Sequence, residues 1–298
     1  IGNNFVFVRT YNTAWTDWIA LKLEINVGSG YAVEQHFTSL TKAILLATKY
    51  KNAVVNVYNG TFDLYQEFIE QYGSDFFTNY TANTKPRGLH LTNNVYVKCS
   101  SNSKIVFHYT GDNVNVLQQF SPIDYLSDCF DGFTLENATV ECSRCRYVVH
   151  DATSDTSRAY QNRYISCKFS IDNSNSASWP QESVLGGGLG RAGAVTIDGC
   201  VFDSVEFMTG TDVSVHRLLS YHNDVSTDQA INSVEIRNSY LSGTGKIVVY
   251  YGGTNPVDSS KVIITGNSMG ASIVEAPTRG SDTIHNMKIY EWNNVIRN

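Results

Sequence analysis

The stretch Ala194-Val195-Thr196-Ile197-Asp198-Gly199-Cys200-Val201-Phe202 decides the fold of this chain. Its two apolar residues at alternate positions, Val195 and Ile197, indicate a strand with one buried face, because successive side chains of a strand point to opposite sides. Gly199 then marks a bend, since glycine and asparagine adopt left-handed backbone angles at low cost. The next apolar residue, Phe202, is expected to return to the core on a new strand.

This strand–bend–strand pattern returns along the chain at intervals of roughly 20 to 30 residues, which is the signature of a stacked solenoid. We therefore predict an all-β fold, a right-handed parallel β-helix, in which one apolar residue of each copy stacks inward above the last. The expected inward residues are Leu91, Leu135, Ile197, Ile236 and Ile264. Further copies of the pattern lie at residues 89–96, 133–140, 234–241 and 262–269, with looser ones at 213–220 and 287–294.

Composition narrows the possible functions. The 298 residues carry a formal net charge of −6, which argues against a nucleic-acid partner because phosphate binding requires concentrated Lys and Arg. No apolar run approaches the roughly 20 residues that cross a membrane, so we expect no membrane insertion. The chain opens at Ile1 without a signal-peptide pattern, and we expect it to be a piece of something longer.

The six cysteines are expected to be free and buried, packing as small hydrophobic residues inside the coil. Disulfides are the alternative, although a solenoid of this size does not need them. Cys142 and Cys145 form a single Cys-x-x-Cys pair with no second pair, so zinc is a weaker alternative, and we predict neither a metal nor a cofactor. The others are Cys99, Cys129, Cys167 and Cys200.

The N-terminal part differs from the repeats. In residues 1–24, apolar and polar residues alternate on both sides of a turn, which predicts a β-hairpin module with aromatic residues on one face. Gly28 and Gly30 mark a joint before the β-helix domain, predicted at residues 25–298. Within it, residues 34–50 have the apolar spacing of a helix, which is expected to cap the open end of the coil.

Two stretches carry a resemblance to known proteins. The series Arg9-Thr10-Tyr11-Asn12-Thr13-Ala14-Trp15-Thr16-Asp17-Trp18 resembles a short hairpin module of phage tail fibres and tailspikes. Residues 25–298 resemble the pectin-lyase-like β-helix proteins of phages and prophages of Gram-positive bacteria, through Gly60-Thr61-Phe62-Asp63, residues 185–189 and 221–224, and the closing segment 282–297.

This resemblance implies a tail-associated, receptor-binding protein of the virion that acts outside the cell. Its implied partners are bacterial surface polysaccharide, other phage tail or baseplate proteins, and two further copies of itself in a homotrimer. The alternative is a depolymerase, a hydrolase or lyase that cleaves capsule or cell-wall glycan; a secreted bacterial lyase is a weaker third reading. The hydrolase motifs of polygalacturonase-like enzymes and the calcium ligands of pectate lyases are absent from the sequence, so whether the protein is an enzyme stays open.

Cleavage of a glycosidic bond by hydrolysis requires two carboxylates about 5 to 10 Å apart, and neighbouring coils of a β-helix provide such spacings. Imidazole beside a carboxylate serves proton transfer. The predicted catalytic residues are Asp151, Asp155, Glu182, His222 and Asp224, with Asp128, Asp131, Asp198, Asp203 and Asp228 as further carboxylates.

Binding of a glycan requires aromatic rings for the C–H faces of sugars and polar groups for their hydroxyls. We expect these groups on the long insertions of the coil, which gather on one flank. The insertions are predicted at residues 108–126, 150–160, 173–191 and 250–260, and the predicted glycan-binding residues are His150, Trp179, Arg191, Tyr250 and Tyr251.

Overall fold

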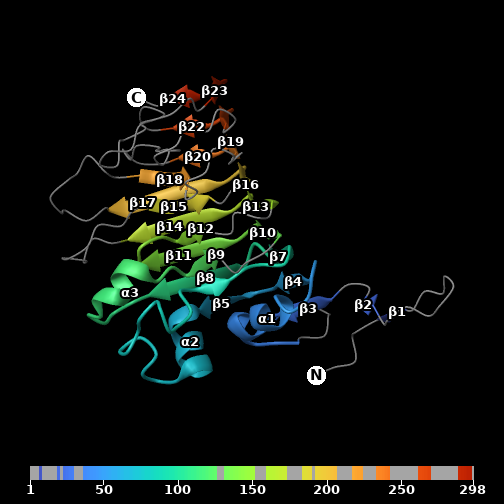
Figure 1. Cartoon of the computed structure of the whole chain (residues 1–298), viewed down its shortest axis with the longest axis vertical. Helices are drawn as coiled ribbons and strands as arrows, with labels where there is room; N and C mark the ends of the chain where they lie inside the picture. The colour runs from blue at the N-terminus through green and yellow to red at the C-terminus, as the bar shows by residue number, and fades with distance from the viewer. Residues whose placement is uncertain are drawn as a thin grey trace.

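The protein consists mostly of β-strands in stacked, all-parallel sheets, with few helices (Figure 1). This arrangement is consistent with the predicted parallel β-helix. None of the described helices is long and apolar enough to span a membrane. The computed structural model describes residues 7–8, 19–20, 23–29, 36–125, 131–151, 159–172, 183–189, 192–206, 217–223, 233–241, 261–269 and 288–296.

Three parallel sheets form the body of the described chain. The nine-stranded sheet contains β3 (Glu24–Val27), β4 (Val54–Val57), β7 (Val95–Cys99), β10 (Gly132–Glu136), β13 (Ala159–Ile165), β16 (Ala192–Asp198), β19 (Ser233–Arg237), β21 (Lys261–Thr265) and β23 (Lys288–Trp292). The eight-stranded sheet contains β5 (Gly60–Asp63), β8 (Ser103–His108), β11 (Thr139–Ser143), β14 (Lys168–Asp172), β17 (Val201–Glu206), β20 (Tyr240–Leu241), β22 (Ser268–Met269) and β24 (Val295–Ile296). The five-stranded sheet contains β6 (Leu89–His90), β9 (Ile123–Tyr125), β12 (Val149–Asp151), β15 (Ser183–Leu189) and β18 (Arg217–Asn223).

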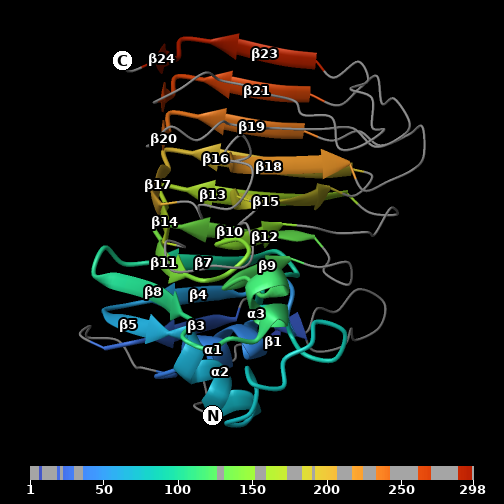
Figure 2. The same cartoon turned by 90° about the vertical axis from the view of Figure 1, so that its left-hand side faces the viewer.

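The chain visits the three sheets in rotation. From β7 to β18 each strand of the nine-stranded sheet is followed by one of the eight-stranded sheet and then by one of the five-stranded sheet. Figure 2 shows the resulting stack, in which strands lie one above another from the blue N-terminal end to the red C-terminal end. Every strand between the ends of a sheet thus pairs with the preceding and the following coil, which satisfies its backbone on both sides.

The stacked register gives the core its apolar columns. Leu135 pairs with Tyr164, and the same column continues through Ile197, Ile236 and Ile264, each with no exposed surface. Burial of each such side chain contributes about 1.5 to 3 kcal/mol. Four of the five residues predicted to stack inward therefore share one column.

Leu91 is buried but lies outside that column. It directly follows β6 of the five-stranded sheet, and Val97 of β7 pairs with Leu135 in its place. The copy of the pattern at residues 89–96 spans the corner that leads into the nine-stranded sheet, whereas the copies at residues 133–140, 194–202, 234–241 and 262–269 span the corner that leaves it. The two corners have the same local pattern, because a buried strand, a left-handed bend and a new strand are needed at both.

One residue with a left-handed backbone stands at the corner between the nine-stranded and eight-stranded sheets in each of the last six coils. These residues are Asn137 (φ 56°), Ser166 (53°), Gly199 (63°), Asn238 (51°), Gly266 (67°) and Asn293 (55°). The bends predicted from Gly and Asn are thus present, and Ser166 adds one that the pattern did not mark.

In several coils the residue after the bend is buried, and its side chain bonds to the preceding coil. Cys167 Sγ lies 3.2 Å from the carbonyl oxygen of Leu135, and Cys200 Sγ lies 3.4 Å from that of Tyr164. Asn267 takes the same position two coils later, where its Nδ2 donates to Ile236 O at 3.0 Å. Its Oδ1 accepts from Ser239 N at 2.9 Å, so its side chain bridges two backbone groups of the preceding coil.

The N-terminal end departs from the prediction in two places. The sequence of residues 53–62 predicts the first strand of the coil and its turn, but the parallel sheet begins one strand earlier, because β3 pairs with β4 in register. Helix α1 covers Leu40–Ala47, which is shorter than the predicted 34–50. It begins there because Ser39 caps it, and because His36 and Phe37 instead bond through their backbone amides to Asn26 O of β3.

Helix α1 packs against β3, β4 and β6 at the N-terminal end of the stack (Figure 2). The chain later leaves the coil for α2 (Leu64–Tyr72) and again for α3 (Val114–Gln119).

Of the predicted hairpin module, the structure describes only β1 (Phe7–Val8) and β2 (Ile19–Ala20), which pair antiparallel. The rest of residues 1–22 lies outside the described part.

Replacing Asn267 with alanine tests the hydrogen bonds that join the corner of one coil to the preceding coil. Asn267→Ala leaves two buried backbone groups without their partners, and we expect it to lower the free energy of unfolding by about 2 to 4 kcal/mol. Urea unfolding followed by circular dichroism measures the loss. The control is Ser268→Ala at the neighbouring, partly exposed position, with an expected change within about 0.5 kcal/mol. Equal effects of the two substitutions would show that these hydrogen bonds do not stabilise the corner.

Candidate functional site

Most of the predicted site residues lie outside the described residues. These are Asp155, Glu182, Asp224, Trp179, Arg191, Tyr250 and Tyr251, together with Asp128 and Asp228. The backbone of His222 is described in β18, where it pairs with Gly188. Gly186 and Gly187 belong to β15 and pair with β18, so part of the insertion predicted at residues 173–191 is a strand of the five-stranded sheet.

Asp151 lies inside the coil. Its Oδ2 accepts a hydrogen bond from Tyr164 Oη at 2.8 Å, and its Oδ1 accepts one from Asn162 Nδ2. Asn162 Oδ1 in turn accepts from Phe133 N at 3.2 Å. None of the side chains of Asp151, Asn162 and Tyr164 is exposed. The carboxylate therefore holds two successive coils together, and its burial argues against contact with a polymer in solvent.

His150 belongs to a cluster with the buried Asp124 and the partly exposed His90, which come from adjacent strands of the five-stranded sheet. His150 Nδ1 lies 2.8 Å from Asp124 Oδ1, and His90 Nε2 lies 3.3 Å from Asp124 Oδ2. The His150 ring also stacks on Tyr147, with centroids 5.1 Å apart. His150, predicted to bind glycan, is thus mostly committed to partners within the protein.

The groups around Asp124 determine the pKa of its carboxyl. Complete burial alone would raise the pKa of this carboxyl, but hydrogen bonds and charge interactions with His150 and His90 outweigh it and hold the pKa below its usual value. Asp124 was not among the residues predicted from the sequence, since only the register of β6, β9 and β12 brings it between the two histidines.

Two other predicted carboxylates lie at the surface in ion pairs. Asp131 contacts Lys51 at 2.8 Å, and Asp198 accepts from Arg237 Nε at 3.0 Å. Arg237 also reaches Glu235 at 3.3 Å, so these charges form a small network on the outer face of the nine-stranded sheet. No group of three His, Cys, Asp or Glu side chains among the described residues is arranged to hold a metal.

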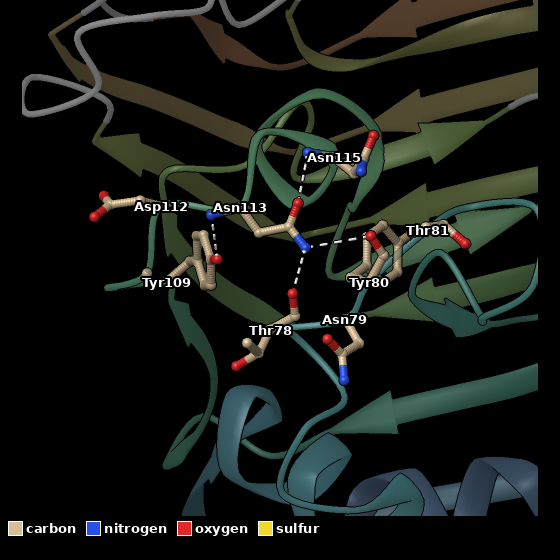
Figure 3. A pocket seen from close by; sticks show the side chains of 9 residues that line it. Thr78, Asn79, Tyr80, Thr81, Tyr109, Asp112, Asn113 and Asn115 are labelled. Atoms are coloured by element: carbon tan, nitrogen blue, oxygen red, sulfur yellow. Dashed lines mark hydrogen bonds between the residues drawn. The ribbon is translucent and has the colours of Figure 1, made fainter.

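A pocket of the described chain lies between the loop after α2 and the segment that precedes α3 (Figure 3). Its volume is about 580 Å³. Both walls come from excursions of the coil, and one of them falls in the insertion predicted at residues 108–126. Thr78, Asn79, Tyr80 and Thr81 line one side, and Tyr109, Gly111, Asp112, Asn113 and Asn115 line the other.

Asn113 joins the two walls of this pocket. Its Nδ2 donates to the carbonyl oxygens of Phe77, Thr78 and Tyr80 at 2.9, 3.1 and 3.2 Å. Its Oδ1 accepts from Asn115 N at 3.0 Å and caps α3 (Figure 3). The side chain of Asn113 is therefore fully used in holding the loop to the helix, and it positions the pocket.

Aromatic packing anchors both walls to the coil. Phe120, which ends α3, stacks on Phe107 of β8 with ring centroids 4.7 Å apart. Phe77 and Tyr80 of the other wall also contact the Phe120 ring, at 5.2 and 5.7 Å in edge-on geometry. Aromatic pairs of this kind contribute about 0.5 to 1.5 kcal/mol each beyond their buried area. The pocket is therefore built on a rigid base.

The Tyr109 side chain forms a corner of the pocket. Its hydroxyl accepts from Asn113 N at 2.9 Å, and burial raises its pKa. The chain passes so close that a Cβ on Gly111 would lie 2.5 Å from Tyr109 Oη. Arg144 covers the ring at 5.9 Å and reaches Asp112 Oδ1 at 3.3 Å.

The groups left for a ligand are polar. Thr78, Asn79, Thr81 and Asp112 are exposed at the pocket, whereas the rings of Tyr80 and Tyr109 are buried. Asp112 is the one carboxylate among the nine lining residues, so the pocket lacks the pair of acids that hydrolysis requires. Such a surface hydrogen-bonds hydroxyl groups well but offers no open ring for stacking.

Exposed rings occur instead near the C-terminal end of the described chain. Tyr290 and Trp292 are 47% and 48% exposed. They occupy the outer face of β23, because the alternate positions Ile289 and Glu291 are in register with buried Val262 and Ile264. Neither ring was among the residues predicted to bind glycan, since the prediction placed binding only on the insertions.

The buried Asp124 makes stability depend on pH. A carboxyl whose pKa is lowered in the folded state stabilises the fold above its unfolded pKa of about 3.9, and this contribution disappears as the pH falls through the folded pKa. We expect Asp124→Asn to lower the free energy of unfolding at pH 6 by about 1 to 3 kcal/mol, and the difference from the wild type to narrow below about pH 4. Urea midpoints between pH 3 and pH 7 measure this.

Asp131→Asn is the matched control, because it changes a carboxylate in a partly exposed ion pair, which is worth at most about 1 kcal/mol. A constant difference between the wild type and Asp124→Asn over the whole pH range would contradict the assignment to Asp124.

Asn113→Asp tests the clamp of the pocket, that is, the hydrogen bonds by which the Asn113 side chain joins the two walls. The aspartate keeps the oxygen that caps α3 but places a second oxygen against three carbonyl oxygens, so we expect the loop at residues 77–81 to detach while α3 persists. Hydrogen exchange of the loop amides should accelerate by about tenfold or more, as expected if the free energy of local opening falls by some 1.4 kcal/mol. Asn115→Ala is the control, and unchanged exchange in Asn113→Asp would contradict the clamp.

Comparison with known proteins assigns no family to the chain. No protein-family model matches it, and neither does a curated protein or a solved structure. The resemblance to pectin-lyase-like phage tail proteins therefore stays a prediction from the motifs quoted above.

Proposed function

We propose that this protein is a host-recognition protein of a phage or prophage tail, which binds glycan on the bacterial surface through loops of a right-handed parallel β-helix. Residues 1–24 form its tail-fibre-like hairpin module, and α1 caps the coil. It is proposed to belong to the virion as a homotrimer, beside other tail or baseplate proteins. Three copies of a shallow site would gain avidity without a deep pocket.

The observation that carries this proposal is the pocket between the two excursions. Hydroxyl, amide and carboxylate groups at Thr78, Asn79, Thr81 and Asp112 suit a ligand rich in hydroxyls. The stacked coils and the aromatic base hold these groups in place, which limits the entropy lost on binding. A single carboxylate in the pocket favours binding there over hydrolysis.

Binding is tested with a panel of purified wall and capsular polysaccharides from Gram-positive bacteria in a surface-binding assay. We expect Asn79→Ala and Asp112→Ala each to weaken the affinity for the bound polysaccharide about fivefold, the effect of one lost hydrogen bond of about 1 kcal/mol. Lys104→Ala, which removes an ion pair with Glu141 elsewhere on the coil, is the control. Undiminished binding by both pocket variants would exclude the pocket as the site.

The alternative, a depolymerase, is distinguished by its products. The same polysaccharides are incubated with the protein and assayed for new reducing ends and for the absorbance of unsaturated uronates. Steady formation of product that Asp224→Asn abolishes would replace the binding function with catalysis. Binding without product supports the recognition function.

A further inference from the structure

Two cysteines lie in contact behind the pocket wall. Cys142 stands in β11 and Cys145 follows it by three residues, with Sγ atoms 3.2 Å apart. Both side chains are buried, and neither sulfur is in a disulfide. Arg144 between them has a left-handed backbone (φ 54°), and this turn folds Cys145 back onto Cys142.

The geometry of this pair approaches that of a disulfide. A disulfide has an S–S length of about 2.05 Å, so the two sulfur atoms need to approach by only a little over 1 Å. The thiols at the corners of the coil belong to different coils. Cys167 and Cys200 point at carbonyl oxygens of the preceding coil, at 3.2 and 3.4 Å, and also contact each other. Cys142 and Cys145 are only three residues apart, so a cross-link between them closes a short ring within one coil.

We propose that Cys142 and Cys145 form a redox modification site, which a peroxide oxidises to an intramolecular disulfide. In the first step one thiol takes up oxygen from hydrogen peroxide, becomes a sulfenic acid and releases water. In the second step the other sulfur attacks the sulfenic sulfur, the S–S bond forms, the S–O bond breaks and a second water leaves. The peroxide is reduced and the two thiols are oxidised, so atoms and electrons balance.

The position of the pair gives the modification a structural consequence. The disulfide closes a ring around the turn that carries Arg144, whose guanidinium covers Tyr109 and contacts Asp112 at the edge of the pocket. Oxidation therefore fixes that edge of the pocket. Burial raises the pKa of the Cys142 thiol, so it reacts more slowly than an exposed cysteine and the reduced pair persists in the absence of oxidant.

The test uses the full chain with Cys129→Ser, so that Cys142 is the only cysteine between Lys104 and Arg144. The reduced protein is treated with hydrogen peroxide while folded, and the remaining thiols are then alkylated in denaturant. Trypsin cleaves after Lys104, Arg144 and Arg146, which separates Cys142 from Cys145. Mass spectrometry therefore detects the disulfide as peptide 105–144 joined to the dipeptide 145–146, two hydrogens lighter than the sum of its parts.

We expect this joined peptide to be the predominant cross-linked product, to disappear after reduction with dithiothreitol and to be absent in the Cys145→Ser variant. The proposal is overturned if Cys142 and Cys145 are both recovered as alkylated thiols, or if Cys142 is joined to other cysteines as often as to Cys145. Neither readout depends on glycan binding, so the outcome is independent of the proposed function.

Discussion

The constraint on which the structure depends is the alignment of each coil with the next. A strand of a parallel sheet bonds to both neighbours only when it keeps their register, and the corners that leave the nine-stranded sheet from β10 onward each turn in two residues. Left-handed residues such as Asn137, Gly199 and Asn238 make that turn possible, because they bend the chain sharply within one residue. A bend that took one residue more would move the next apolar side chain to the outer face.

The same constraint explains why function is expected on the excursions. Residues within the coil are fixed by pairing with two neighbours, so a change of side chain there disturbs a column or a corner. The segments that leave the coil, such as the loop after α2 and the one that precedes α3, are not constrained by strand pairing with neighbouring coils. They meet at the pocket because Asn113 and the Phe120 ring join them above β8, and they can vary while the coil keeps its register.

Sequence periodicity predicted the features that repeat and missed those that depend on pairs of coils. Leu135, Ile197, Ile236 and Ile264 were predicted to share a column because each follows the same local pattern, and they do. No pattern in the sequence near Asp124 singled it out as a candidate, since the histidines that contact it are distant in sequence. Leu91 shows the limit of the pattern itself: two corners of the coil have similar local sequences, and only strand pairing tells them apart.

The polar residues inside the coil show why a sequence alone cannot separate catalysis from architecture here. Asp151 sits beside His150 in the sequence, which resembles an acid–base pair. Yet successive residues of a strand point to opposite faces, so Asp151 turns toward Asn162 and Tyr164 while His150 turns toward Asp124. Each group then meets a partner from another coil, and a wrong register would leave a buried charge unpaired. The cost of that error is several kcal/mol, which makes these groups selective for one stacking of the coils.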